Sequence, residues 1–414
     1  MSLLGDLLNT VFERRYAGAS GDDSRPIDRL ARDLLEAGDE MTELELARRI
    51  LDRYERMDDG ERLAFFGFLT DGCGIDTGEL REALDRYEAE QSIGTYRALM
   101  AAAEPPRQEL FRRLNRVPGA TAKLVQMRGD LLRVTRDHPS LKRLDTDLRH
   151  LLRSWFNRGF LVLRPISWET PANVLEKIIH YEAVHAIHSW EDLRLRLEPP
   201  DRRCFAFFHP AMPDDPLIFV EVALTRGVPG RIDDLLTGSR KALQPGKADT
   251  AVFYSISNCQ RGLAGISFGN SLIKQVVAEL SAECPQLRTF VTLSPIPGLA
   301  AWMAEQGMTL TPEDDDAAAR LPRIAARYLL GLDGQRPKDP VARFHLGNGA
   351  EIHDIHVAAD LSESGRRQSH GVMVNYLYDP DRIARNLAGL AAGRPAASRR
   401  VQGLARQAEK KEPS

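Results

Sequence analysis

The sequence predicts an α+β protein with several domains, in which an all-helical N-terminal bundle precedes a mixed α/β domain. Its 414 residues are too many for one ordinary hydrophobic core. Apolar residues recur with a helical period in the first part of the chain, and at Gly159 short apolar runs typical of strands begin. Helical patterns between several of these runs indicate a sheet covered by helices. We expect a helical domain, an α/β domain and a basic C-terminal tail, at residues 1–158, 159–382 and 383–414.

Helix-start signals and one very apolar helix support the helical domain. The segments Thr42–Glu45 and Asp76–Glu79 have the spacing of a capping box, in which two side chains each satisfy a free N–H group at the start of a helix. Between them, Phe65, Phe66 and Phe68 almost surround a helix, which must be buried against its neighbours or a partner chain. No catalytic cluster is evident in this domain. We therefore expect it to be a scaffold that forms a homo-oligomer, either a dimer or a tetramer.

The second domain combines strand patterns with helical ones. A helix is expected over residues 171–187, because Thr170 and Pro171 have the character of a cap and a first helical residue. Apolar, β-branched and aromatic runs predict strands at 159–166, 203–208, 217–224, 251–257, 288–294, 351–358 and 371–378. The basic tail that follows is either a solvated helix or a segment that contacts a phosphate-bearing partner.

Composition and charge exclude several classes of protein. A formal net charge of −3 gives no general reason to expect binding to nucleic acid. The four cysteines include no CxxC pair, and His185 and His188 are not part of an H-E-x-x-H motif, so we expect no metal site. No apolar run approaches the roughly 20 residues that span a bilayer, and no secretory signal is evident. A cytoplasmic location without membrane contact is expected.

The segment from residue 251 to 297 has the pattern of a strand, a glycine-rich loop, a helix and a second strand. Gly262, Gly265 and Gly269 lie in the loop, and Asn270 stands where a P-loop would have glycine and lysine. A helix N-terminus after such a loop can present backbone N–H groups to a phosphate. The glycines are therefore either a phosphate-binding loop or a structural turn.

Two polar residues near predicted strand ends are candidates for chemistry. Ser294 lies in LSPIPG, where Pro295 restricts the preceding residue to extended geometry, and is either a site residue or a turn serine. It lacks the G-x-S-x-G elbow of an activated nucleophile. His345 lies in ARFHLGNGAEIH, which we interpret as a strand–loop junction where a general acid can be placed.

Taken together, several segments resemble the malonyl-CoA decarboxylase family. They occur in order from about residue 104 to 379: EPPRQELFRRLN, SWFNRGFLVLRPISWETPANVLEKIIHYEAVHAIHSWEDL, HPAMPDDPLIFVEVALT, FYSISNCQRGLAGISFGNSLIKQVVAEL, LSPIPGLAAWM, FHLGNGAEIH and QSHGVMVNYLYD. The resemblance implies a helical domain used for assembly and a catalytic domain similar to the GNAT acetyltransferases. It also implies malonyl-CoA as substrate and acetyl-CoA and CO2 as products.

The resemblance further implies roles for individual residues. The functional pair of the family falls on Ser294 and His345, and Ser255 of FYSIS is expected near the substrate. The loop with Gly262, Gly265 and Gly269 is expected to bind the diphosphate of coenzyme A. Independently of the resemblance, Asn270 is a secondary candidate for binding the substrate oxygens. Animal relatives have a glutamate where this chain has Ser267, so no role is carried over to that position.

The chemistry of this reaction requires no cofactor. Loss of CO2 from a malonyl thioester leaves an enolate, and the thioester carbonyl is itself the electron sink. The enzyme must orient the carboxylate, donate hydrogen bonds to the thioester oxygen and protonate the carbanion. Two other functions stay open at this stage, a GNAT-type CoA-dependent acyltransferase and a catalytically silent CoA-binding regulatory protein.

Overall fold

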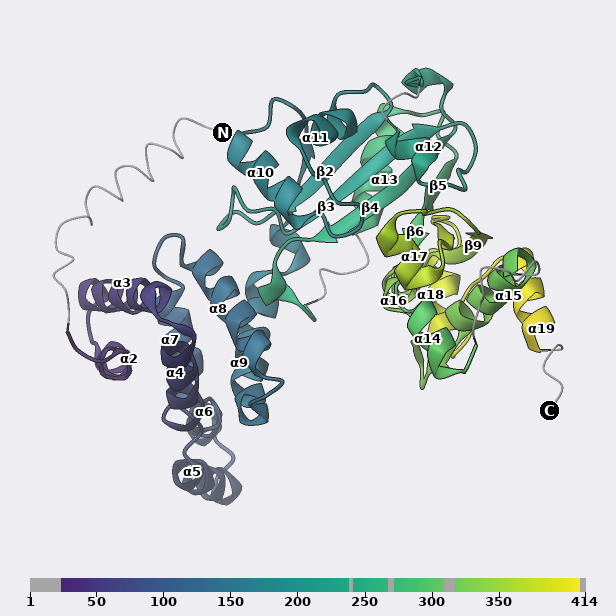
Figure 1. Ribbon diagram of the computed structural model, residues 1–414. Helices are drawn as coiled ribbons and strands as arrows, with labels where there is room; N and C mark the ends of the chain where they lie inside the picture. The colour runs from purple at the N-terminus through teal and green to yellow at the C-terminus, as the bar shows by residue number, and fades with distance from the viewer. Residues whose placement is uncertain (1–23, 238–240, 267–271, 309–316, 410–414) are drawn as a thin grey trace. The chain divides into compact units, whose positions relative to one another are not determined.

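The computed structural model describes four ranges of the chain, residues 24–237, 241–266, 272–308 and 317–409. The chain divides into two compact units (Figure 1). The helical unit comprises residues 1–155 and also Gln260–Ile266, and the α/β unit comprises residues 156–259 and 267–414. The predicted fold class, a helical part followed by a mixed α/β part, is confirmed.

The helical unit is built from amphipathic helices around a core of leucine and phenylalanine side chains. Phe65 and Phe66 are buried in this core, and Phe68 packs at its edge. The very apolar helix is therefore covered by its own neighbours. The helices are α2 (Ile27–Glu36), α3 (Glu40–Arg56), α4 (Asp59–Asp71), α5 (Thr77–Ala89), α6 (Ile93–Ala103), α7 (Pro106–Leu114), α8 (Ala120–Val134) and α9 (Lys142–Trp155), with 3-10 turns at Pro139–Leu141 (η1) and Arg261–Leu263 (η4).

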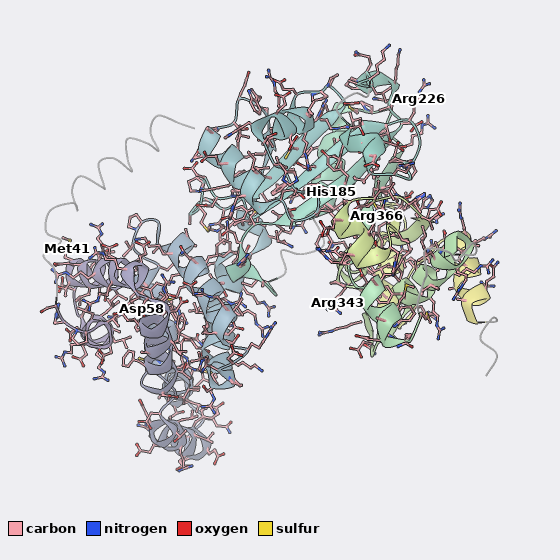
Figure 2. The ribbon with its side chains drawn as sticks, in the orientation of Figure 1. Met41, Asp58, His185, Arg226, Arg343 and Arg366 are labelled. Atoms are coloured by element: carbon pink, nitrogen blue, oxygen red, sulfur yellow. The ribbon has the colours of Figure 1, made fainter. Side chains whose placement is uncertain are left out.

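Aspartates cap helices α3, α4 and α5 of this unit. Asp58, labelled in Figure 2, forms a capping box with Glu61 at the start of α4, and Asp76 caps α5 as expected. The expected capping box at Thr42 is wrong, because α3 begins earlier. Its cap is Asp39, whose side chain accepts a hydrogen bond from the Thr42 N–H at 2.9 Å.

The α/β unit contains one large mixed sheet with the strand order β1-β2-β3-β4-β5-β10-β6, in which β9 also pairs with β10. The first four strands are antiparallel, whereas β4 and β5 are parallel and are joined through helix α13. All the expected strands are present, and the run at 288–294 forms two strands. The bounds are β1 (Val162–Ile166), β2 (Arg202–Phe208), β3 (Ile218–Thr225), β4 (Thr250–Asn258), β5 (Thr289–Thr292), β6 (Ser294–Pro295), β9 (Glu351–His356) and β10 (Met373–Leu377).

Helices cover this sheet and continue beyond it. Helix α10 begins later and ends earlier than expected, so His185 and His188 follow it in a loop. The Thr170 hydroxyl does not cap this helix but accepts a hydrogen bond from the Ser167 N–H. The helices and the small hairpin are α10 (Ala172–Tyr181), α11 (Trp190–Leu197), α12 (Asp233–Leu236), η3 (Pro245–Lys247), α13 (Leu272–Glu283), α14 (Leu299–Glu305), α15 (Ala317–Leu330), β7 (Leu332–Asp333), β8 (Arg336–Pro337), α16 (Pro340–Gly347), α17 (Glu363–Ser369), α18 (Ile383–Ala391) and α19 (Arg399–Glu409), with a further 3-10 turn, η2 (Arg158–Phe160), before β1.

The basic C-terminal segment packs onto the α/β unit. Helix α19 contacts α15 and β9, and Val401 on α19 is fully buried. The expected solvated tail is therefore a packed helix over the described residues. Within those residues, no helix combines the length and the apolar character needed to cross a membrane.

Candidate active site

The site lies where two parallel strands separate. Strands β4 and β5 pair only from Thr250↔Thr289 to Phe253↔Thr292. Beyond Phe253, β4 continues to Asn258 along β3 alone, while the chain after Thr292 passes to β6 and pairs with β10. A sheet that loses pairing in this way opens a gap between its strands, and Ser294 is the first residue of β6 beyond that point.

The structure places Ser294 and His345 side by side. The Ser294 Oγ lies 3.3 Å from His345 Nε2 and donates a hydrogen bond to Thr292 Oγ1 at 2.8 Å. Both side chains are buried. Thr292 Oγ1 also accepts a hydrogen bond from the Tyr376 N–H at 3.1 Å. Because the Ser294 hydroxyl hydrogen is directed at Thr292, its oxygen can accept a hydrogen bond from His345.

His345 lies on helix α16, so the interpretation of its surroundings as a strand–loop junction is wrong. Asp339 caps this helix through hydrogen bonds from two N–H groups, and Pro340 is its first residue. Arg343, labelled in Figure 2, precedes His345 by two positions on the same helix. The imidazole of His345 stacks on the Tyr376 ring, with 4.4 Å between the ring centroids.

The position of the proton on His345 follows from its neighbours. Its Nδ1 lies 2.8 Å from the hydroxyl of Tyr378. Burial lowers the pKa of His345 to about 3, so the imidazole is neutral, and burial raises the pKa of Tyr378, which therefore keeps its proton. Tyr378 then donates to Nδ1, and Nε2–H donates toward Ser294. The neutral imidazole thus presents its one proton on the side of the serine.

A pocket of about 210 Å³ adjoins this pair. Its walls are mostly apolar, and Ser294 and His345 are among the polar side chains that line it. A pocket with mostly apolar walls strengthens the electrostatic interactions of any charge that enters it. The lining residues are Val184, Phe253, Tyr254, Ile256, Asn258, Ser294, Pro295, Pro340, Val341, Phe344 and His345.

Comparison with known proteins identifies the family. Residues 159–414 match the family model described as the malonyl-CoA decarboxylase C-terminal domain, and residues 74–156 match the N-terminal domain of the same family. The chain belongs to the malonyl-CoA decarboxylase family. A curated relative from Anser anser anser, named malonyl-CoA decarboxylase, mitochondrial, is 34% identical over 396 residues, which are 81% of this chain and 78% of the relative.

Solved structures of malonyl-CoA decarboxylases from bacteria share the fold. The protein from Rhodopseudomonas palustris is 48% identical, with a TM-score of 0.86 over 91% of this chain and 98% of that chain. The protein from Agrobacterium vitis is also 48% identical, with a TM-score of 0.85 over 92% of this chain and 99% of that chain. The likeness extends over both units of the chain.

In this member of the malonyl-CoA decarboxylase family, the Ser255 hydroxyl is bound to a carboxylate. It donates to the carboxylate of Glu182, with distances of 2.9 and 2.7 Å to the two oxygens. Glu182 also accepts hydrogen bonds from the N–H groups of Val184 and His185, each at 2.8 Å. Since Val184 lines the pocket, Ser255 helps to hold a pocket wall. A direct contact of Ser255 with substrate stays a prediction.

The glycine loop is described in part. Gly262 packs against helix α8, where an added Cβ would lie 1.7 Å from the carbonyl oxygen of Val125. Gly265 has a φ of 73°, which favours glycine. The fold alone therefore explains why glycine occupies both positions, and binding of the loop to a diphosphate stays a prediction. Gly269 and Asn270, together with Ser267, lie outside the described residues.

Tyr378 and Thr292 are site residues that the sequence analysis did not identify. Tyr378 follows β10, and Thr292 ends β5, so both come from predicted strands but are polar groups at their ends. A polar residue at the end of a predicted strand is the only sequence signal that points to either of them. Among the residues that the structure describes, no group of three or more His, Cys, Asp or Glu side chains is arranged to hold a metal ion.

Proposed function

We propose that this protein converts malonyl-CoA to acetyl-CoA and CO2 in the pocket that contains Ser294 and His345. The observation that supports this most directly is the buried row of Tyr378, His345 and Ser294 at that pocket, in a chain of this family. When substrate binds, the Ser294 hydroxyl can turn from Thr292 and donate to the malonyl carboxylate. It then holds that group out of the thioester plane, so that the breaking C–C bond overlaps with the carbonyl.

The proton balance of the reaction assigns a role to His345. The substrate carboxylate carries a negative charge into a pocket with mostly apolar walls, where that charge favours the imidazolium form of His345. Loss of CO2 moves the electron pair onto the thioester as an enolate. The Nε2–H then protonates the enolate carbon, which returns His345 to the neutral form. One proton is consumed in each turnover, and Tyr378 keeps the imidazole in the required orientation.

The remaining requirement is a set of donors for the thioester oxygen. Strand β4 beyond Phe253 is paired with β3 on one side only, and Tyr254, Ile256 and Asn258 of this part line the pocket, which supports an open-edge backbone donor there. We propose that backbone N–H groups of this edge bind the thioester oxygen and that the loop with Gly262 and Gly265 binds the diphosphate. The thioester is the electron sink, so the proposed mechanism includes no cofactor.

Release of CO2 and acetyl-CoA from malonyl-CoA, with no acyl acceptor present, tests the proposed function. His345→Ala should lower kcat by roughly 10²–10⁴-fold, the usual contribution of a general acid. Ser294→Ala should lower kcat at saturating substrate. Full activity of both variants would contradict the mechanism. Acyl transfer to an added amine without CO2 release would instead favour an acyltransferase, and tight binding without turnover would favour a regulatory protein.

We also propose that the protein self-associates through the helical unit. Phe65 and Phe66 are buried in its own core and leave little surface for a partner. Helix α6, in contrast, exposes Ile93 by 68%, Tyr96 by 47% and Met100 by 54%, at spacings that place them on one helix face. Sedimentation should show a dimer or a tetramer that Met100→Glu dissociates. A monomeric wild-type protein at micromolar concentration would refute this. The cytoplasmic location stays a prediction.

A further inference from the structure

Arg128 is a buried arginine in the middle of helix α8, and its partners belong to another part of the sequence. Its side chain is 1% exposed. The Nε donates to Asp145 Oδ1 on α9 at 2.7 Å. The Nη1 donates to the carbonyl oxygens of Gly262 at 2.6 Å and Ala264 at 3.0 Å. Figure 1 shows α8, against which this loop packs.

The loop fits closely onto the helix at this point. Besides the tight contact of Gly262, a Cβ added to Gly129 on α8 would lie 3.6 Å from the Gly262 nitrogen. Backbone therefore packs against backbone, and glycine is used on both sides of the contact. Because the charge of Arg128 is balanced by Asp145, its effect on the loop is one of orientation rather than of net charge.

Pinning a carbonyl group also orients the N–H group of the same peptide bond. In a trans peptide, the C=O and the following N–H point in opposite directions. The carbonyl of Ala264 points at Arg128, so the N–H of Gly265 points away from α8. A backbone N–H directed out of a glycine loop is the kind of donor that a phosphate oxygen accepts.

We propose that Arg128 is a positioning residue for the coenzyme A diphosphate. By fixing the carbonyl of Ala264, it holds the Gly265 N–H outward, where a diphosphate oxygen can accept its hydrogen bond. The N–H groups of Leu263, Ala264 and Ile266 are bonded within the loop. This inference depends on the proposed role of the loop in binding coenzyme A.

Arg107 provides a matched control in the same unit. It is also buried, with 5% exposure, and its Nε donates to Asp147 Oδ2 at 2.6 Å. Its Nη1 donates to the carbonyl of Thr70 at 3.0 Å. The two arginines thus make the same kinds of bonds, but those of Arg107 stay among the helices. Arg107→Gln should destabilise the helical unit without affecting the loop.

The experiment compares Arg128→Gln with Arg107→Gln on two substrates, malonyl-CoA and malonyl-pantetheine, which lacks the diphosphate. Loss of charge-assisted hydrogen bonds to the loop should raise the KM for malonyl-CoA about 10-fold in Arg128→Gln. Its kcat, and its kcat/KM for malonyl-pantetheine, should stay near those of the wild type. Arg107→Gln should lower the melting temperature but leave both KM values unchanged. If Arg128→Gln does not fold, Asp145→Asn, which keeps the side-chain size, should give a smaller change of the same kind.

Equal effects of the two arginine variants on the KM for malonyl-CoA would overturn the inference. So would an equal loss of kcat/KM on both substrates in Arg128→Gln, because the role would then be general stability. A wild-type enzyme that releases CO2 equally well from both substrates would overturn the role of the loop as well. A wild-type enzyme that releases no CO2 from either substrate would overturn the proposed function itself.

Discussion

Removing the Tyr378 hydroxyl tests whether the hydrogen bond to His345 Nδ1 matters for catalysis. Tyr378→Phe keeps the ring and deletes one donor from a site in which His345 is 3% exposed. No water replaces the donor in such a buried position without a rearrangement. An unsatisfied buried acceptor costs roughly 1–3 kcal/mol, so the free energy of unfolding should fall by about that amount.

Catalysis should be affected by the same change. Without the Tyr378 hydroxyl, Nδ1 loses the group that donates to it in the neutral imidazole and accepts from it in the imidazolium, so the ring is no longer held with Nε2 toward Ser294. If half of the lost interaction energy, about 0.5–1.5 kcal/mol, is expressed in the transition state, kcat falls by roughly 2- to 13-fold, since each 1.36 kcal/mol is a factor of 10. Steady-state release of CO2 at saturating malonyl-CoA measures kcat, and urea unfolding measures stability.

Tyr376 offers a control with the same chemical change on the other side of His345. Its ring stacks on the imidazole, but its hydroxyl is buried and has no hydrogen-bond partner among the described residues. Tyr376→Phe removes that unpartnered group, so stability should be unchanged or slightly higher. Full kcat in Tyr378→Phe, or an equal loss of kcat in both variants, would refute the assigned role of Tyr378.

Three further predictions concern stability and the pocket wall. The pKa of His345 is about 3 in the fold and near 6.5 in the unfolded chain, so its contribution to the free energy of unfolding is present above pH 6.5 and is lost as pH falls toward 3. The free energy of unfolding should therefore fall less steeply with acid in His345→Asn. An unchanged slope would contradict the lowered pKa. Gly262→Ala should lower the melting temperature more than Gly265→Ala, because its added Cβ would lie 1.7 Å from a backbone oxygen. The Cβ added at Gly265 meets nothing within 4 Å and costs only about 1–2 kcal/mol of backbone strain. A melting temperature lower in the Gly265 variant than in the Gly262 variant would contradict this order. Ser255→Ala should lower kcat/KM by about 10-fold through the loss of a bond to the buried Glu182, and unaltered kinetics would show that this bond does not hold the wall.

Local signals predicted much of the fold. The strands were located because each is an apolar run between turn residues, which is a property of neighbouring residues. Two predictions are wrong although the neighbouring residues carry the deciding signal. Asp339 and Pro340 are a typical cap and first residue of a helix, and they indicate that His345 is helical. Asp39 likewise precedes Thr42 as the cap of α3.

The site could be predicted only in part, for a different reason. Family motifs indicated Ser294 and His345, but nothing local to Tyr378 or Thr292 indicates that their hydroxyls meet that pair. Their positions depend on the pairing of β10 with β5 and β6, which joins segments about eighty residues apart. The contact of Arg128 with the glycine loop is of the same long-range kind.

The register of β10 explains how residues from three segments form one site. Val374 on β10 pairs with Ser294, and the Tyr378 N–H, just beyond the strand, bonds to the carbonyl of Phe290 at 2.9 Å. One strand therefore sets the separation of Ser294 and Tyr378, and the imidazole of His345 fits between their hydroxyls. A shift of β10 by one residue would turn Tyr378 to the other face of the sheet and leave Nδ1 without its donor. The reactive geometry is thus determined by strand pairing as much as by the side chains themselves.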